Sequence, residues 1–408
     1  MPTALTVRTL LALVAACGFS GTASAQVAVR GETVYTMAGE ALSDAVVVVE
    51  AGKITRVGAA ADVEIPSGYR VLRAKVVTPG LVDAHTTIGL SGYLNQPHDQ
   101  DQLERSAAIQ PELRAVDAYN PREMLVGWAR GYGVTTIHTG HGPGALVSGQ
   151  TFIAKTRGST VEQAVVKPVA MVAATMGEGA RGADNKSPGT RAKMAAMLRS
   201  ELIKAQEYAA KLEVAEAGKE PSRNLRTEAF VKVVTGELPL LVTVHRSHDI
   251  LTALRIAEEF KIKMVLDGAA EAYEILDEIK AAGVPVIVHA TMYRARGETE
   301  NLSFETASKL YAAGIPTALQ SGFEGYVPKS RLILFEAGVA AGHGLSFDNA
   351  LRGITIDAAK IIGVDDRVGS IEIGKDGDLA LYDGDPFEYT THCFGVVIEG
   401  EVVSEDVR

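Results

Sequence analysis

The chain has 408 residues, of which 47% are hydrophobic, 22% charged and 6% aromatic. This balance is typical of a globular protein and excludes a disordered or collagen-like chain. The net charge of −10 argues against a nucleic-acid partner, because binding to phosphates requires a basic face. Two cysteines are too few for a disulfide scaffold.

Residues 1–25 have the pattern of a secretory signal peptide. Arg8 is the basic residue, Leu10–Phe19 is the apolar core, and Ala23–Ala25 is a small-residue cleavage site. The pattern predicts an exported, periplasmic protein that is cleaved after Ala25. A lipoprotein anchored through Cys17 is the alternative. The apolar run is too short to span a membrane as a stable helix, and no other stretch of the sequence is long and apolar enough.

The two ends of the remaining sequence are strand-like. Residues 26–77 contain the β-branched run Ala45–Glu50, and residues 369–408 contain the similar run Asp378–Tyr382. Short β segments at opposite ends of a chain usually pair, because neither can bury its apolar face alone. We therefore expect one small β-sandwich domain made of both ends.

Residues 78–368 alternate between strand and helix patterns. The expected strands are Leu81–His85, Gly133–His138, Thr151–Thr156, Pro168–Ala174, Leu240–His245, Ile262–Leu266, Val284–His289 and Ile315–Gln320. The expected helices cover 190–212, 249–260, 270–282, 303–313 and 330–341, and each of the last three is followed by a glycine that would cap it. The alternation predicts an α/β fold, a (β/α)8 TIM-type barrel. The link from Thr156 to Pro168 shows no clear helix, so it is a hairpin or an insertion.

Histidines are concentrated where these strands end. His85, His138, His245 and His289 each close an expected strand, and His141 and His248 lie three residues beyond two of those ends. In a barrel the carboxyl ends of the strands meet on one face, where the active site is built. Neutral imidazole is a common metal ligand, and any single histidine here could equally be a polar cap.

Four segments resemble the amidohydrolase superfamily, most closely its imidazolonepropionase-like branch. Val77–Thr87 is similar to the strand-one signature P-G-[L/I]-[I/V]-D-x-H-x-H, and Gly133–Thr136 matches the second strand. Thr355–Gly363 and Gly369–Ala380 resemble the helix and the segment that lead back into the β-sandwich of these enzymes. The similarity covers nearly the whole chain after residue 25.

The resemblance implies a metal site, and this chain keeps only part of its ligand set. His85 corresponds to the first strand-one histidine, His245 to the strand-five histidine, and Glu178 to a carboxylate that some members use. The other three expected ligand positions hold Thr87, Gly268 and Gly322. The residue lost at 322 is an aspartate that takes a proton from the metal-bound water, which glycine cannot do.

Two hypotheses follow from this pattern. The first is a hydrolase of amide or lactam C–N bonds in non-peptide or small-peptide substrates, acting through a metal-activated water. Its divalent metal, one zinc ion, would be held by His85, Glu178, His245 and His289, and its general base would be Glu324 or Asp267. The second is a catalytically degenerate relative that binds a small molecule without hydrolysing it.

The same face offers candidates for substrate contacts. They are His138, His141, Arg246 and His248, and Arg246 could pair with a substrate carboxylate. The partner expected from the resemblance is a small-molecule substrate. A homo-oligomer is compatible with the sequence, which does not determine the oligomeric state.

Overall fold

The computed structural model describes residues 26–182, 186–291, 294–323 and 333–408. The predicted signal peptide, its alternative lipid anchor Cys17 and the candidate base Glu324 lie outside the described residues. Within the described ranges, no helix is long and apolar enough to cross a membrane.

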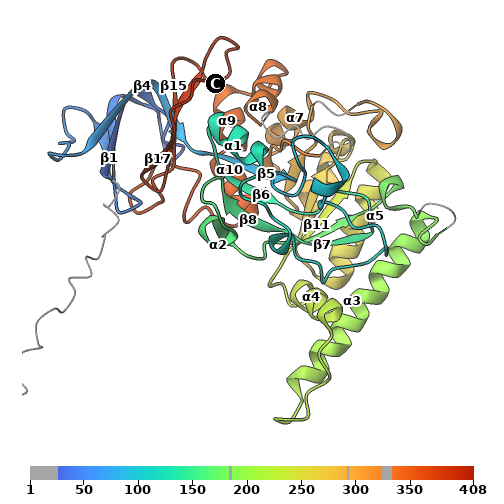
Figure 1. Ribbon diagram of the computed structural model, residues 1–408. Helices are drawn as coiled ribbons and strands as arrows, with labels where there is room; N and C mark the ends of the chain where they lie inside the picture. The colour runs from blue at the N-terminus through green and yellow to red at the C-terminus, as the bar shows by residue number, and fades with distance from the viewer. Residues whose placement is uncertain (1–25, 183–185, 292–293, 324–332) are drawn as a thin grey trace, which may run out of the picture.

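The two ends of the chain form a single seven-stranded sheet, which lies beside the barrel (Figure 1). Its strand order is β17-β16-β15-β4-β1-β2-β3. The strands are β1 (Gln26–Val34), β2 (Leu42–Glu50), β3 (Lys53–Ala59), β4 (Arg70–Pro79), β15 (Leu379–Tyr382), β16 (Cys393–Ile398) and β17 (Glu401–Ser404). The sheet curls over one apolar core that includes Val29 of β1, Val47 of β2 and Val397 of β16. The predicted pairing of the two ends is confirmed.

The middle of the chain forms the barrel. Its strands are β5 (Leu81–Thr86), β6 (Val134–Thr139), β7 (Val147–Gln150), β8 (Phe152–Lys155), β9 (Val165–Lys167), β10 (Val172–Thr175), β11 (Leu240–Val244), β12 (Met264–Gly268), β13 (Val286–Val288) and β14 (Thr317–Ala318). Strands β10 to β14 pair in parallel, as do β5 and β6. A parallel bridge between Thr86 and Gly322 joins the first strand to the chain that follows the last. The α/β barrel with a β-sandwich is therefore confirmed.

The third strand position of the barrel wall, formed by β7 and β8, runs antiparallel to its neighbours. Strands β7 and β8 are separated only by Thr151, and they pair antiparallel with β10 and β6 respectively. A parallel stave would need a long crossover helix, but α2 (Val161–Ala164) has only four residues. The link between Thr156 and Pro168, where the sequence shows no clear helix, therefore follows a strand that runs antiparallel to its neighbours and needs no crossover helix.

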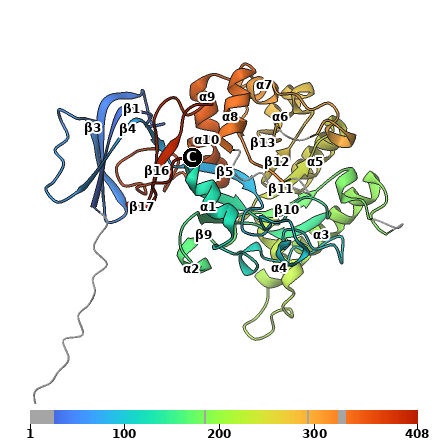
Figure 2. The same cartoon turned by 45° about the horizontal axis from the view of Figure 1, so that its top comes forward.

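The helices cover the outside of the barrel (Figure 2). They are α1 (Met124–Gly131), α3 (Arg191–Glu213), α4 (Leu225–Val234), α5 (Ser247–Phe260), α6 (Leu276–Ala282), α7 (Thr306–Ala312), α8 (Ile333–Gly342), α9 (Phe347–Gly353) and α10 (Ile356–Ile362). Helices α3 and α4 pack on each other and project from one side of the molecule. Gly283 caps α6 in the left-handed region as predicted, whereas Gly342 is the last residue of α8 and does not cap it.

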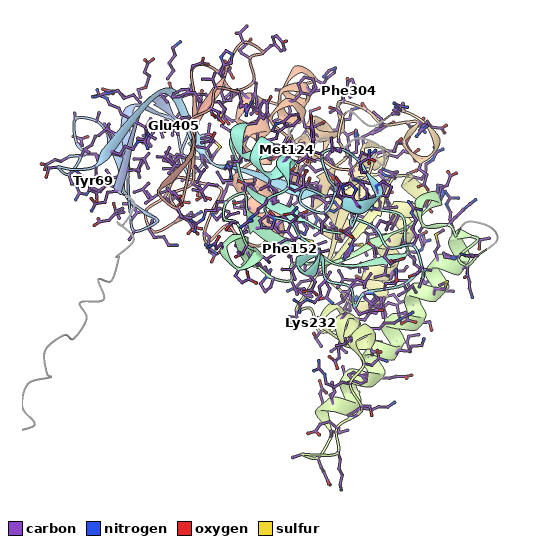
Figure 3. All side chains as sticks on the ribbon, in the orientation of Figure 1. Tyr69, Met124, Phe152, Lys232, Phe304 and Glu405 are labelled. Atoms are coloured by element: carbon purple, nitrogen blue, oxygen red, sulfur yellow. The ribbon has the colours of Figure 1, made fainter. Side chains whose placement is uncertain are left out.

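The barrel interior is apolar in its lower half. Its lining side chains include Val82, Leu241, Val265, Ile287 and Ala318, which pack against α10 at the base. The face toward the outer helices holds larger side chains, among them Phe152 (Figure 3). The ring of Phe152 meets Tyr119 edge-on, with centroids 5.0 Å apart. The next inward residues toward the carboxyl ends of the strands are polar, so the change from apolar to polar marks the floor of the site.

Candidate functional site

A bulge in the first barrel strand turns His85 into the barrel. The pairing register between β5 and β6 shifts between Asp83 and Thr86. The three-residue step from Asp83 to Thr86 lies opposite the two-residue step from Ile137 to Thr139. Val82 and Ala84 face the interior, and the slip lets His85 face it too. Ser321, in the segment after the last barrel strand, stabilises this region. Its backbone N–H and its hydroxyl donate to the two carboxylate oxygens of Asp83 at 3.0 and 2.5 Å.

His85 belongs to a hydrogen-bonded layer that crosses the barrel. Its Nδ1 lies 3.0 Å from Oδ1 of Asp267 on β12, on the opposite side. Asp267 also accepts bonds from Thr243 Oγ1 of β11 at 2.5 Å and from Gln320 Nε2, beyond β14, at 2.8 Å. The side chains of His85 and Asp267 are only 5% and 4% exposed. Three side chains from other parts of the barrel wall therefore converge on the buried carboxylate of Asp267.

The charges of this pair support each other. Burial opposes the protonation of His85, but the charge and the hydrogen bond of Asp267 outweigh it, so the pKa of His85 is raised. Burial also disfavours the ionised form of Asp267, yet His85, Thr243 and Gln320 together lower the pKa of that carboxyl. Both oxygens of Asp267 accept hydrogen bonds within the layer, Oδ1 from His85 and Gln320 and Oδ2 from Thr243, and its role as general base stays a prediction.

His245 lies directly above the layer. A side chain at Gly268 would collide with its ring, since an ideal Cβ there would be 2.6 Å from His245 Cε1. Gly268 has φ +79°, a conformation that favours glycine. Burial lowers the pKa of His245 to about 4. The position where a strand-six histidine was expected is therefore filled by the ring of the strand-five histidine.

The other two replaced positions are engaged in local structure. Thr87 is buried, and its hydroxyl accepts a bond from Ser91 Oγ at 3.0 Å. The backbone N–H of Gly322 donates to the carbonyl of His85 at 3.2 Å, which holds the ring closure.

The predicted metal ligands do not gather around one point. Glu178 is exposed on the 3-10 turn Glu178–Ala180, and His289 points its Nε2 toward Thr306 Oγ1 of α7 at 3.4 Å. In the described part of the chain, no group of three or more His, Cys, Asp or Glu residues could hold a metal ion. The predicted arrangement of His85, Glu178, His245 and His289 about a shared ion is therefore absent.

Two of the predicted substrate contacts are buried in the barrel wall. His138 uses both ring nitrogens, at 2.7 Å from the Ala84 carbonyl and 2.7 Å from Thr151 Oγ1. Burial lowers its pKa to about 3. His141 packs against Gly149, and burial lowers its pKa to about 4. His138 therefore supports the bulge of β5 and has no nitrogen left for a ligand.

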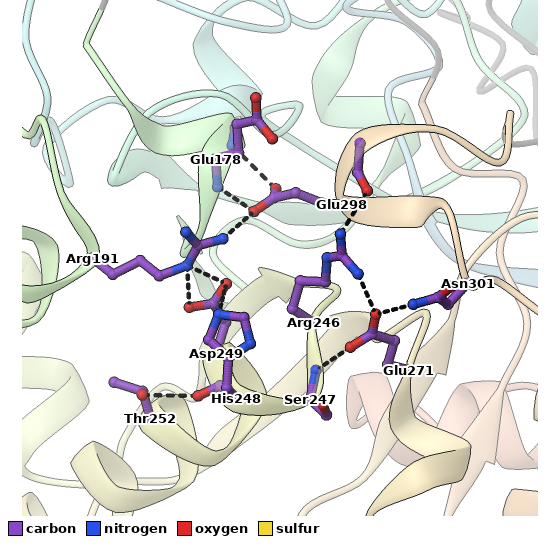
Figure 4. Close-up of polar contacts among 12 residues, drawn as sticks. Glu178, Arg191, Arg246, Ser247, His248, Asp249, Thr252, Glu271, Glu298 and Asn301 are labelled. Atoms are coloured by element: carbon purple, nitrogen blue, oxygen red, sulfur yellow. Dashed lines mark hydrogen bonds and ion pairs between the residues drawn. The ribbon is translucent and has the colours of Figure 1, made fainter.

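Charged side chains connect the loops above the barrel (Figure 4). Arg246 is held by Glu271 and Glu300 at 2.8 and 2.6 Å, so its guanidinium already has carboxylate partners. Hydrogen bonds to Glu271 and Glu300 raise its pKa. His248 is exposed and lies 3.5 Å from Asp249 Oδ2. Arg246 thus joins protein loops, and His248 faces the groove lined by α3 and α5.

Glu298 connects two of these loops. It lies in the described part of the β13–α7 loop, residues 294–305, and accepts bonds from the backbone N–H groups of Glu178 and Gly179. Arg191 of α3 lies 3.5 Å from Glu298 and 2.9 Å from Asp249. The loops after β10, β11 and β13 are therefore joined at the barrel mouth.

Comparisons with known proteins agree with this architecture. The Amidohydrolase family profile matches residues 330–404. The crystal structure of an amidohydrolase from Thermotoga maritima is 30% identical, with a TM-score of 0.88, covering 93% of this chain and all of that one. The chain belongs to the amidohydrolase family. An imidazolonepropionase from Fusobacterium nucleatum is 24% identical over 86% of this chain and 87% of its own length. A Xaa-Pro dipeptidase structure, 15% identical with a TM-score of 0.58 over 93% of this chain and all of that one, shares the fold.

Amidohydrolase-family proteins typically bind a divalent metal, and the residues described here do not fit one. Three ligand positions are replaced, both oxygens of Asp267 already accept hydrogen bonds, and Glu178 is exposed. One buried polar atom at the centre, His85 Nε2, has no hydrogen-bond partner in the described ranges of the chain. This family member therefore presents a polar layer in place of a ligand cluster.

Sequence reasoning missed two residues of the layer, Thr243 and Gln320. Each lies two positions after an inward apolar residue, Leu241 and Ala318 respectively. Because side chains alternate along a strand, this spacing was a usable signal. Threonine and glutamine near strand ends are common, however, so their type alone did not single them out.

Proposed function

We propose that this amidohydrolase hydrolyses an amide or lactam C–N bond of a small organic molecule at the carboxyl end of its barrel. The observation that carries the proposal is the buried His85 Nε2, beside the strand ends where barrel enzymes place their chemistry, for which the residues that the structure describes provide no hydrogen-bond partner. A neutral imidazole nitrogen can accept a proton from water. Family membership supports hydrolysis as the reaction class.

The names of related proteins support the substrate class. Imidazolonepropionase and Xaa-Pro dipeptidase denote a cyclic non-peptide substrate and a small peptide, and both reactions break C–N bonds. We therefore propose a non-peptide or small-peptide C–N bond. The proposed reaction class does not depend on the zinc expected from the resemblance, for which the described residues do not assemble ligands.

We also propose that the protein acts outside the cytoplasm, on the basis of the signal pattern in residues 1–25. Expression of the full chain in a Gram-negative host, followed by fractionation and N-terminal sequencing, tests this. A periplasmic protein that begins at Gln26 supports it. Retention in the cytoplasm with an intact leader contradicts it, and membrane attachment that is lost in Cys17→Ala supports the lipid anchor.

Hydrolysis is tested with a defined panel of compounds: imidazolonepropionate, hydantoin, N-acetyl amino acids and Xaa-Pro dipeptides. Turnover of any of them should be lost in His85→Gln and kept in His343→Gln, an exposed histidine just after α8 that makes a matched control. If every panel compound is left intact, or if His85→Gln is as active as the unmodified protein, the proposal is wrong.

Binding without hydrolysis is the second candidate. It is favoured by Gly322, because glycine has no side chain that could act as a base at the position of the expected aspartate. Calorimetric titration with the same panel distinguishes the two functions, because a binder gives a saturable heat and no product.

A further inference from the structure

We propose that the His85–Asp267 pair takes the place of the metal ion in this barrel, so that the site is complete without a metal and His85 Nε2 is its proton acceptor. The structural half of this inference, that the site is complete without a metal, does not depend on the proposed function. The catalytic half rests on the proposed function.

Position is the first argument for replacement. Asp267 lies on β12, and His85 reaches it from β5 across the barrel interior, with 3.0 Å between Nδ1 and Oδ1. The layer stands one inward residue above the apolar floor formed by Leu241 and Val265. The pair therefore occupies the interior level at which the ends of the strands would present metal ligands.

The surroundings of the pair are built to hold it. Thr243 and Gln320 both donate to Asp267, and they come from different staves. A buried carboxylate is costly unless it is paired and hydrogen-bonded, and here three donors satisfy it. A metal in this layer would have to compete with the existing hydrogen bonds for the same carboxylate oxygens.

Two of the replaced ligand positions cannot readily hold a ligand side chain. At position 268 the ring of His245 occupies the space that a side chain would need, and φ is +79°. At position 322 φ is +69°, a conformation that favours glycine, and the backbone N–H donates to the backbone carbonyl of His85. A ligand side chain restored at either position would therefore strain the backbone.

The hydrogen bond also determines which nitrogen of His85 is free. An ionised carboxylate only accepts hydrogen bonds, so in the neutral form of His85, which predominates above its raised pKa, the proton lies on Nδ1 and points at Asp267. The lone pair is then on Nε2, which is buried and has no hydrogen-bond partner among the described residues. Asp267 is thus a positioning residue, and His85 is the catalytic residue.

The reaction balances without any further reactant. His85 Nε2 takes a proton from water while the water oxygen bonds to the carbonyl carbon of the substrate. The same proton then passes from His85 to the leaving nitrogen as the C–N bond breaks. The products are a carboxylic acid and an amine, and His85 returns to its starting form.

Metal content tests the structural half directly. The EDTA-treated protein is dialysed against zinc chloride, then against buffer, and analysed by inductively coupled plasma mass spectrometry. We expect zinc far below one ion per chain and an unchanged melting temperature after EDTA. One zinc per chain that disappears in His85→Ala, but not in His248→Ala, would overturn the inference.

Nitrogen-15 NMR of histidine-labelled protein tests the role of Asp267. We expect a His85 signal with the proton on Nδ1, assigned by its loss in His85→Gln. In Asp267→Asn the proton should move to Nε2, because the amide NH2 group can donate to Nδ1. Thr243→Val, which removes a single donor to Asp267, provides a milder variant, and Thr243→Ser restores the hydroxyl. An unchanged tautomer in Asp267→Asn would overturn the positioning role.

Activity then separates the two proposals. With the panel compound that is hydrolysed fastest, turnover should persist in EDTA and fall by about 10²–10⁴-fold in Asp267→Asn. Thr243→Val should lower turnover while Thr243→Ser restores it, with little change in KM. Hydrolysis that requires added zinc would overturn the inference and leave the proposed function standing. No hydrolysis, together with a metal-free protein and the expected tautomer, would overturn the proposed function and leave only the structural half.

Discussion

Lys155, on the antiparallel third stave, forms an ion pair with Asp376 of the sandwich segment, with Nζ and Oδ2 3.0 Å apart. Lys155 also pairs with Asp378, and the three side chains are 1–3% exposed. The antiparallel direction places Lys155 at the base of the barrel, away from the site. The pair therefore ties the barrel to the sandwich.

Replacing Lys155 by methionine should destabilise the protein by about 3–5 kcal/mol, because it leaves buried carboxylates without their central partner. Urea unfolding followed by circular dichroism measures the change. Lys53 is a matched control, since it also bonds Asp376, at 2.7 Å, but is half exposed. Lys53→Met should cost no more than about 1 kcal/mol. Equal losses in the two variants would contradict the importance of the buried pair.

Gly268→Ala tests the packing of His245 against β12. The new Cβ would meet the His245 ring at 2.6 Å in a left-handed conformation, so we expect a loss of about 2–4 kcal/mol. Gly283→Ala is the control, because Gly283 has φ +65° with no atom within 4 Å of the built Cβ, and should lose only about 1 kcal/mol. In His245→Ala the cost of Gly268→Ala should shrink toward the control value. Additive losses would show that the ring is not the obstacle.

The sequence predicted the positions of the barrel strands better than it predicted their directions. Alternating side chains indicate a strand but not its direction. The residues up to Lys155 were therefore predicted as a strand, but not as an antiparallel one. The reversal could have been suspected only from the missing helix between Thr156 and Pro168. The pairing of the two ends of the chain followed from burial alone and was predicted.

The candidate site was predicted less completely. His85 and His245 were placed at strand ends, where the structure has them. Their partners depend on contacts between distant segments, and Asp267 lies 182 residues from His85. The bulge that turns His85 inward has no composition signal. A family motif could show which ligands were missing, but only packing could show what replaced them.

Buried neutral histidines should make the protein sensitive to acid. The pKa values of His138, His141 and His245 are lowered to about 3, about 4 and about 4, in each case chiefly by burial. A lowered folded-state pKa stabilises fully above the unfolded value near 6.5, and the gain is lost as the pH falls through the folded value. We therefore expect stability to decrease steeply between pH 6.5 and about 4.

His141→Gln isolates one of these contributions. It should flatten the loss of stability between pH 7 and pH 4.5 by up to about 3 kcal/mol, whatever it costs at pH 7. Urea midpoints measured across this range give the slope. The exposed His248→Gln is the matched control and should leave the slope unchanged. An identical slope in His141→Gln would exclude His141 as a source of the acid sensitivity.

Glu298 should hold the β13–α7 loop at the barrel mouth. In Glu298→Ala the loop loses its bonds to the backbone N–H groups of Glu178 and Gly179 and its contact with Arg191, so local opening becomes easier. Hydrogen–deuterium exchange in residues 294–305 and 177–180 should rise by about ten- to a hundredfold, equivalent to about 1–3 kcal/mol. Glu300→Ala is the control in the same loop, because Glu300 is half exposed and Arg246 keeps Glu271 as its other partner. Its exchange should rise by less than about fivefold. If both variants exchange alike, the loop is held by something other than Glu298, and the N–H groups of Glu178 and Gly179 do not anchor it.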